Sequence, residues 1–264
     1  MRIMSAWAAG LAILLGLASA ARADDNQKIV DVPTRPGVTQ RLLMIAPPDA
    51  KAAIILIPGG HGGLQLQPNG DMRWGEGNFV VRTRQMFARS GLVTALLDAP
   101  SDRQEPPFLQ GFRQRPEHAA DLKAVIAWLR ETYKVPVWLV GTSRGTQSAG
   151  YVATELAEGG GPDGVVLTST ILSDDKGRPV TAMPLERIKV PVLVVQHEAD
   201  GCPHCKFSDA PTLMAKLSNA SRKQLLAVKG GTNQGDPCEA KAYHGFNGLD
   251  SEVVPQIAAW ILAK

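Results

Sequence analysis

Short apolar runs alternate with helical patterns along most of this chain, and that rhythm limits its fold more than any other feature. The run Ala52–Ile57, written AAIILI, is apolar at every position, as in a strand buried on both faces. Similar runs occupy 93–97, 137–140, 165–168, 192–196 and 225–228, and helical patterns occupy 78–90, 117–133, 143–156 and 253–263. This order predicts an α/β fold, with a mostly parallel, doubly wound sheet and helices on both faces.

The region before this pattern divides into two parts. Residues 1–23 combine a basic start, an apolar run at 6–17 and small-x-small motifs ending at Ala20 and Ala23. That layout predicts a secretory signal peptide, and the run is shorter than the ~20 residues of a membrane-spanning helix. Residues 28–32 and 39–45 alternate and predict an antiparallel edge hairpin. We therefore expect an exported protein, periplasmic or secreted, with residues 24–264 as one domain and no integral membrane segment after signal removal.

Net charge and motifs exclude several partners. The formal charge is only +3, and Arg2 and Arg22 of the expected signal contribute to it. A chain this close to neutral is not expected to bind nucleic acid. Four glycines lie between Gly59 and Gly63, but no phosphate-binding motif surrounds them. We expect no cofactor and no metal, and the oligomeric state stays open.

A serine between glycines follows one of the predicted strands. Residues 141–145 read GTSRG, a G-x-S-x-G motif between the strand at 137–140 and the helix at 143–156. A serine on such a sharp strand-to-helix turn has a strained backbone, and small neighbours avoid collisions there. The helix N-terminus favours developing negative charge. Ser143 is therefore the candidate nucleophile, and an ordinary glycine-rich turn is the alternative.

A nucleophilic serine needs a base and an acid that orients the base. Asp200 follows the strand at 192–196, and His244 follows the last strand, which makes Asp200 the candidate acid and His244 the candidate base. The other acids considered are Asp174, Asp175 and Glu198. The other histidines considered are His61, His118, His197 and His204, of which His118 is expected at the surface of a helix.

The order Ser143, Asp200, His244 resembles that of the α/β-hydrolase superfamily, and particularly its dienelactone-hydrolase and esterase-like members. The segment 196–200 (QHEAD) is similar to the family's acid segment without its glycine, and 244–246 (HGF) to its histidine loop. The resemblance covers the chain from Ala52 to the final helix and implies the same fold. Since only about 20 residues (169–189) separate two strands where some members insert a lid, we expect no large lid.

The resemblance also implies an oxyanion hole and a site wall. One backbone N–H should come from Arg144 and the other from Gly60, with His61 as the alternate donor. The wall is expected from Trp74, Phe108, Phe112 and Arg113.

All three cysteines lie in the loops that carry the candidate acid and base. A disulfide there would tie the two together, and we favour Cys202–Cys238 over Cys205–Cys238. Cys202-x-x-Cys205 also fits a thiol-disulfide oxidoreductase, and these two cysteines with His204 and Cys238 could form a zinc site.

The sequence therefore predicts an exported serine hydrolase that cleaves a carboxylic ester of a small-molecule acyl substrate through Ser143, His244 and Asp200. An amidase or thioesterase using the same residues, a thiol-disulfide oxidoreductase and a non-catalytic binding protein of the same fold are the alternatives.

Overall fold

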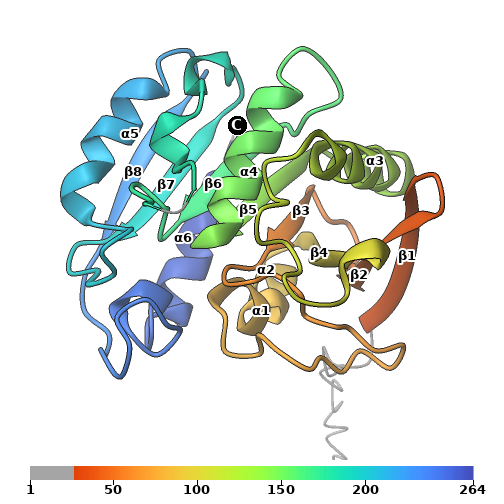
Figure 1. Cartoon of the computed structure of the whole chain (residues 1–264), viewed down its shortest axis with the longest axis horizontal. Coiled ribbons are helices and arrows are strands. Elements are labelled where there is room, and N and C mark those ends of the chain that lie inside the picture. Colours follow the sequence, from red (N-terminus) through yellow and green to blue (C-terminus); the bar gives the residue numbers. More distant parts are fainter. Residues whose placement is uncertain (1–26, 176, 264) are drawn as a thin grey trace, which may run out of the picture.

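The computed structural model describes residues 27–175 and 177–263, so the expected signal peptide lies outside the described residues. Within these ranges one sheet has the strand order β1-β2-β4-β3-β5-β6-β7-β8 (Figure 1). Its strands are β1 (Gln27–Arg35), β2 (Val38–Ile45), β3 (Ala52–Ile57), β4 (Leu92–Pro100), β5 (Val137–Thr142), β6 (Gly164–Thr168), β7 (Val192–His197) and β8 (Lys223–Val228). The β1–β2 and β2–β4 pairs are antiparallel and all other pairs are parallel, which confirms the predicted sheet.

Helices cover both faces of this sheet. They are α1 (Phe79–Arg82), α2 (Arg84–Arg89), α3 (Pro116–Tyr133), α4 (Arg144–Glu155), α5 (Ala210–Lys216) and α6 (Asp250–Leu262). In β3, Ile55 and Ile57 pack with α3, α4 and α5, whereas Ile54 and Leu56 face α1, α2 and α6. A strand that feeds two cores has to be apolar at every position, which explains the AAIILI sequence.

Three local features differ from the sequence-based expectations. The helix expected at 78–90 is two short helices, α1 and α2, separated by Thr83, whose hydroxyl donates to the carbonyl of Phe79. The strand expected at 93–97 continues to Pro100, so Asp98 lies inside β4. Its buried carboxylate accepts backbone N–H groups of Leu64 and Leu66, and it thereby anchors the loop after β3. Helix α5 was not predicted, because few of its residues are buried.

The segment between β6 and β7 contains only two short 3₁₀ turns in its described part, Val180–Ala182 and Leu185–Arg187. It forms no helical lid, as expected. Among the described helices, none combines the length and the apolar character needed to cross a membrane. The loops after the carboxyl ends of β3, β5, β7 and β8 hold Gly60, Ser143, Asp200 and His244.

Candidate active site

Ser143 lies at the sharp turn between β5 and α4. Its backbone has φ 51° and ψ −126°, a conformation that L-residues rarely adopt. Three bonds hold the turn: the Ser143 N–H donates to the carbonyl of Thr168 in β6 (3.0 Å), and the Ser143 carbonyl accepts both the N–H (2.9 Å) and the Oγ1 hydroxyl (2.6 Å) of Thr146. The first N–H groups of α4 have no partner inside the helix, so they are available to an anion beside Ser143.

The two glycines of the G-x-S-x-G motif permit close backbone contacts. A Cβ on Gly141 would lie 2.6 Å from the carbonyl oxygen of Gly145, and a Cβ on Gly145 would collide with the carbonyl oxygen of Ile57. Both approaches exclude any larger side chain. The motif is therefore required by the packing of β3, β5 and α4 around the turn.

The loop after β7 and the loop after β8 bring an acid and a histidine together. Nδ1 of His244 lies 3.0 Å from Oδ2 of Asp200, and both side chains are buried. The other carboxylate oxygen of Asp200 accepts the backbone N–H of Cys202 (2.9 Å), and Gln196 Nε2 donates to Oδ2 (3.3 Å). Because a carboxylate can only accept, Nδ1 of His244 carries a proton and Nε2 is left as the basic nitrogen.

His244 Nε2 has no hydrogen-bond partner among the described residues, although it is buried. This nitrogen and Ser143 belong to residues that line one cavity of about 440 Å³. The two side chains are not hydrogen-bonded to each other. In enzymes without substrate such bonds are often long and tighten only when the complex forms.

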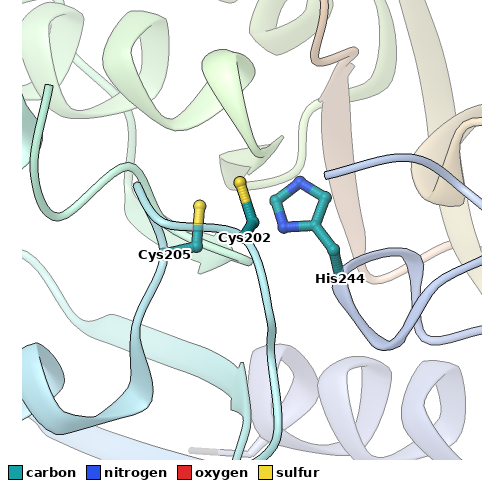
Figure 2. Close-up of side chains that lie close together, drawn as sticks. All are labelled: Cys202, Cys205 and His244. Carbon is teal, nitrogen blue, oxygen red and sulfur yellow. The ribbon is translucent and has the colours of Figure 1, made fainter. Parts of the chain in front are cut away.

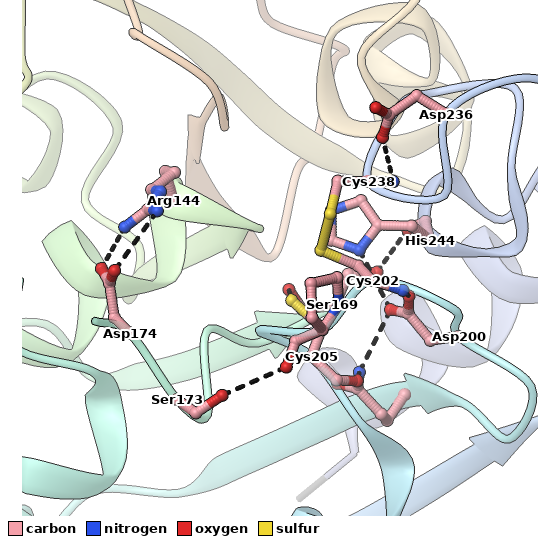
Figure 3. Close-up of a disulfide and its surroundings, with 12 residues drawn as sticks. Arg144, Ser169, Ser173, Asp174, Asp200, Cys202, Cys205, Asp236, Cys238 and His244 are labelled. Atoms are coloured by element: carbon pink, nitrogen blue, oxygen red, sulfur yellow. Dashed lines mark hydrogen bonds and ion pairs between the residues drawn. A yellow bond between two sulfur atoms is a disulfide. The ribbon is translucent and has the colours of Figure 1, made fainter. Parts of the chain in front are cut away.

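The other acids have different partners. Asp174 forms an ion pair with Arg144, which Figure 3 shows well apart from Asp200 and His244. Glu198 is exposed and pairs with Lys229 (3.3 Å), and Asp175 is exposed. Of the acids considered, Asp200 is the one that contacts the candidate base.

None of the other histidines considered is hydrogen-bonded to the carboxylate of Asp200. His197 stacks on Tyr243, with ring centroids 4.4 Å apart, while His204 lines the cavity. His118 is fully buried, so its expected surface position is wrong. It lies on the inner face of α3, with Nε2 2.9 Å from Ser148 Oγ. Burial first, and then the charge of Arg113, lowers the pKa of His118 to about 3, so this imidazole stays neutral.

The glycine loop after β3 is held by a buried guanidinium. Nη2 of Arg113 donates to the carbonyl oxygens of Pro58 (3.0 Å), Gly59 (3.3 Å) and Gly60 (3.2 Å), and Nη1 donates to Ser148 Oγ. Burial lowers the pKa of Arg113 to about 9, so the group still carries its charge at neutral pH. In a trans peptide the C=O and the following N–H point in opposite directions. The N–H of Gly60 therefore points away from Arg113.

The residues expected as a site wall divide into two groups. Trp74 lines the cavity, and it lies so close to Gly60 (φ 54°) that a Cβ there would be 2.5 Å from its ring. The ring of His61 lies between two aromatic rings, with centroids 4.5 Å from Phe108 and 3.9 Å from Trp74. Neither Phe108 nor Phe112 lines this cavity or the second cavity described below, so these two do not form the expected wall, and Phe112 is buried against His118.

A second cavity of about 520 Å³ adjoins the first at Gly60 and Arg144. Its polar wall includes the guanidinium groups of Arg113, Arg144 and Arg178. The cavity that Ser143 and Trp74 line is thus bordered by a second space, whose lining is rich in arginine and glutamine residues.

Cys202 and Cys238 form a disulfide, with a sequence separation of 36 residues (Figure 3). The bond joins the Asp200 loop to the loop that leads to His244. Cys205 is a buried free thiol beside Cys202 and His244 (Figure 2). Because Cys202 is already bonded to Cys238, these residues form neither a zinc site nor a Cys202–Cys205 disulfide in this structure. Burial raises the pKa of the Cys205 thiol well above its usual range.

Ser169 and Arg82 also support the base, and sequence reasoning missed both. Ser169 Oγ donates to the carbonyl of His244 (2.5 Å) from a backbone with φ 46°. Arg82 donates to the carbonyl of Gly245 (2.6 Å) and forms an ion pair with Asp250 (2.6 Å). A serine just after a strand was a weak signal for the first, whereas nothing in the sequence pointed to the second.

Comparison with known proteins relates this architecture to solved structures. No family model matches the chain, and no curated protein matches it. Dienelactone hydrolase from Anabaena variabilis aligns with a TM-score of 0.63 at 16% identity, over 89% of this chain and 96% of that one. The chain has the α/β-hydrolase fold.

Two further structures extend this comparison of the α/β-hydrolase fold. An esterase from Pyrococcus furiosus has a TM-score of 0.63 and 15% identity, covering 99% of this chain and 97% of its own. An α/β serine hydrolase without lid from Xanthomonas campestris has a TM-score of 0.57 and 16% identity, covering 90% and 97%. The α/β-hydrolase fold here likewise lacks a lid in its described part.

Proposed function

We propose that this protein is an exported serine hydrolase that cleaves a carboxylic ester or a related acyl bond. The observation that carries the proposal is the buried bond from His244 Nδ1 to Asp200, with Ser143 on the strained turn in the same cavity. The neighbours described as a dienelactone hydrolase, an esterase and a serine hydrolase support hydrolysis in general. The disulfide supports export, since such bonds persist in oxidising compartments.

The mechanism follows from the roles of these side chains. Ser143 Oγ attacks the acyl carbon while His244 Nε2 takes its proton, and Asp200 holds the imidazole and stabilises its charge. The oxyanion receives hydrogen bonds from the N–H groups of Arg144 and Gly60. His244 then gives the proton to the departing alcohol, and water hydrolyses the acyl-enzyme by the same steps in reverse.

A fluorophosphonate probe tests the nucleophile. We expect labelling of the wild type and none of Ser143→Ala, with a loss of ester hydrolysis of about 10³-fold or more in Ser143→Ala and His244→Ala. Asn219→Ala, which changes an exposed residue that lines neither cavity, is the control for expression and folding. An unlabelled, folded wild type would leave a non-catalytic binding protein as the better explanation.

A substrate panel separates the related reactions. Matched esters, amides and thioesters of increasing acyl length should show ester cleavage as the fastest reaction. Activity on disulfide substrates that survives in Ser143→Ala would instead favour the thiol-disulfide reading of Cys202 and Cys205.

A further inference from the structure

The backbone N–H and the carbonyl of Asn78, at the start of α1, are both hydrogen-bonded. Its N–H donates to the carbonyl of Gly75 (2.9 Å), and its own carbonyl accepts the N–H groups of Val81 (3.0 Å) and Arg82 (2.9 Å). The position of the residue is therefore set by main-chain bonds, and its side chain is not needed to hold it there.

The side chain of Asn78 lacks the contact that its position normally gives. An asparagine at a helix start usually accepts a backbone N–H from the first turn with its side-chain oxygen, but this one makes no such bond. Within the described residues its oxygen Oδ1 is buried without any hydrogen-bond partner. Buried polar groups are nearly always bonded, so packing alone does not explain this carboxamide. Its nitrogen Nδ2 makes no hydrogen bond to a described residue either, so its N–H groups are available to a bound molecule.

The carboxamide lies next to the candidate nucleophile. Asn78 lines the cavity that holds Ser143 and His244. A methyl group on Gly59 would lie 2.8 Å from Cβ of Ser143 and 3.4 Å from Nδ2 of Asn78. The amide nitrogen and the serine thus border the same small space, which exists because residue 59 has no side chain.

Arg82 joins the backbone beside Asn78 to the backbone beside the candidate base. Its guanidinium donates to the carbonyl of Gly77 (2.8 Å), next to Asn78, and to the carbonyl of Gly245 (2.6 Å), next to His244. The loop before α1 and the histidine loop are therefore joined through one side chain, which holds the main chain that carries the carboxamide close to the histidine loop.

We propose that Asn78 is a catalytic residue whose Nδ2–H donates to the oxyanion of the tetrahedral intermediate. The proposal rests on the serine-hydrolase function above. When the bond from Ser143 Oγ to the acyl carbon forms, the carbonyl π electrons move to its oxygen and the serine proton moves to His244. The new anion then has a side-chain donor besides the N–H groups of Gly60 and Arg144. Such a donor acts most strongly on the charge of the transition state.

Steady-state kinetics of Asn78→Ala and the near-isosteric Asn78→Asp test this role. We expect kcat to fall about 10- to 100-fold with KM changed less than about threefold, because the bond forms only in the transition state. The affinity for an alkyl boronic acid, which mimics the tetrahedral intermediate, should fall by a similar factor. Asn219→Ala is the matched control, and the thermal midpoint of each variant verifies folding.

The outcomes separate the two proposals. Unchanged kcat and boronate affinity in folded Asn78 variants, with a wild type that the fluorophosphonate probe labels, would overturn the role of Asn78 alone. A rise of KM without loss of kcat would also overturn it, since it would indicate substrate binding only. A wild type that neither reacts with the probe nor hydrolyses esters would overturn both proposals.

Discussion

Two supports flank Ser143, and they hold backbone in place by different means. On one side Arg113, buried in the interior, bonds three successive carbonyls of the glycine loop. On the other side the Cys202–Cys238 disulfide ties the acid loop to the histidine loop. The first support is a set of charged hydrogen bonds to individual carbonyls, whereas the second is a neutral covalent cross-link between two loops.

The surroundings of each support explain the difference. Most of the glycine loop is buried, although Gly60 itself is exposed, and the Arg113 side chain beneath it is shielded from water and can orient individual peptides. Residues 229–237, which lead to Cys238, are all exposed and have almost no core to pack on. A cross-link can restrict such a segment without burial. Orientation of N–H groups thus requires a buried hydrogen-bond network, while proximity of two loops requires only a tether.

Removing the charged support should have the largest effect. Arg113→Met leaves the carbonyls of Pro58, Gly59 and Gly60 without their donor, so we expect about 3–5 kcal/mol less stability. The N–H of Gly60 is then no longer held in the orientation that the oxyanion needs, so kcat/KM should fall about 100-fold. Urea unfolding and ester hydrolysis measure the two effects. Arg115→Met, an exposed neighbour, is the control, and wild-type kinetics in Arg113→Met would contradict the assigned role.

Removing the covalent support should cost mainly stability. For a loop of this length, Cys202→Ser combined with Cys238→Ser should lower the free energy of unfolding by about 2–4 kcal/mol. Activity should fall less, about 10-fold, since the Asp200–His244 bond can still form. Thermal unfolding and kinetics check this, with Cys205→Ala, which keeps the disulfide, as the matched variant. Equal losses in both variants would show that the tether itself is unimportant.

The buried histidine behind Arg113 gives the charged support a pH dependence. The pKa of His118 is lowered to about 3 in the folded state from an ordinary value of 6.5. The unfolded chain therefore binds the proton first, and stability present above pH 6.5 is lost as the pH falls toward 3. The slope from this group is up to about 1.4 kcal/mol per pH unit. The free energy of unfolding of the wild type and of His118→Gln, measured between pH 4 and 7, should converge at low pH. Parallel curves would refute the lowered pKa of His118.

The smallest effect is expected at Ser169, which adds a hydrogen bond to what the disulfide already restrains. Ser169→Ala removes the bond to the His244 carbonyl, which should lower stability by about 1 kcal/mol. Activity should fall about threefold, since Asp200 still orients the imidazole. In the background without the disulfide the loss should be greater, and a double-mutant cycle of these substitutions measures that coupling. Strict additivity would mean that the two contacts act independently.

The centre of the sheet was predictable because strands buried on both faces have to be apolar at every position. Short, fully apolar runs such as AAIILI in β3 are typical of buried strands, and the helical patterns between them indicate that these strands are parallel. The break at Thr83 was not predictable, since the apolar periodicity of α1 continues into α2. The strand end predicted at Asp98 was wrong, because an isolated acid usually marks a loop. The N–H groups of Leu64 and Leu66 that bond this carboxylate come from another part of the chain, which the local sequence does not show.

The candidate site was predictable where chemistry demands particular residues in a particular order. Ser143, Asp200 and His244 follow strands whose ends meet, so their approach follows from topology. Arg113 and Asn78 were different cases. Arg113 was read as part of a wall because an arginine in a loop is usually exposed, and Asn78 carried no signal because a helix start commonly has an asparagine. Their roles depend on carbonyl and Cβ positions that no local pattern encodes.

The backbone conformation of Ser143 lowers the stability of the fold at the residue that is proposed to perform the chemistry. Glycine adopts positive φ without strain, so Ser143→Gly should fold to a product that is more stable by about 1 kcal/mol and inactive. Selection for stability alone would therefore replace this serine with glycine. A serine at this position is accounted for by the proposed hydrolysis, which needs its hydroxyl and which no glycine can perform.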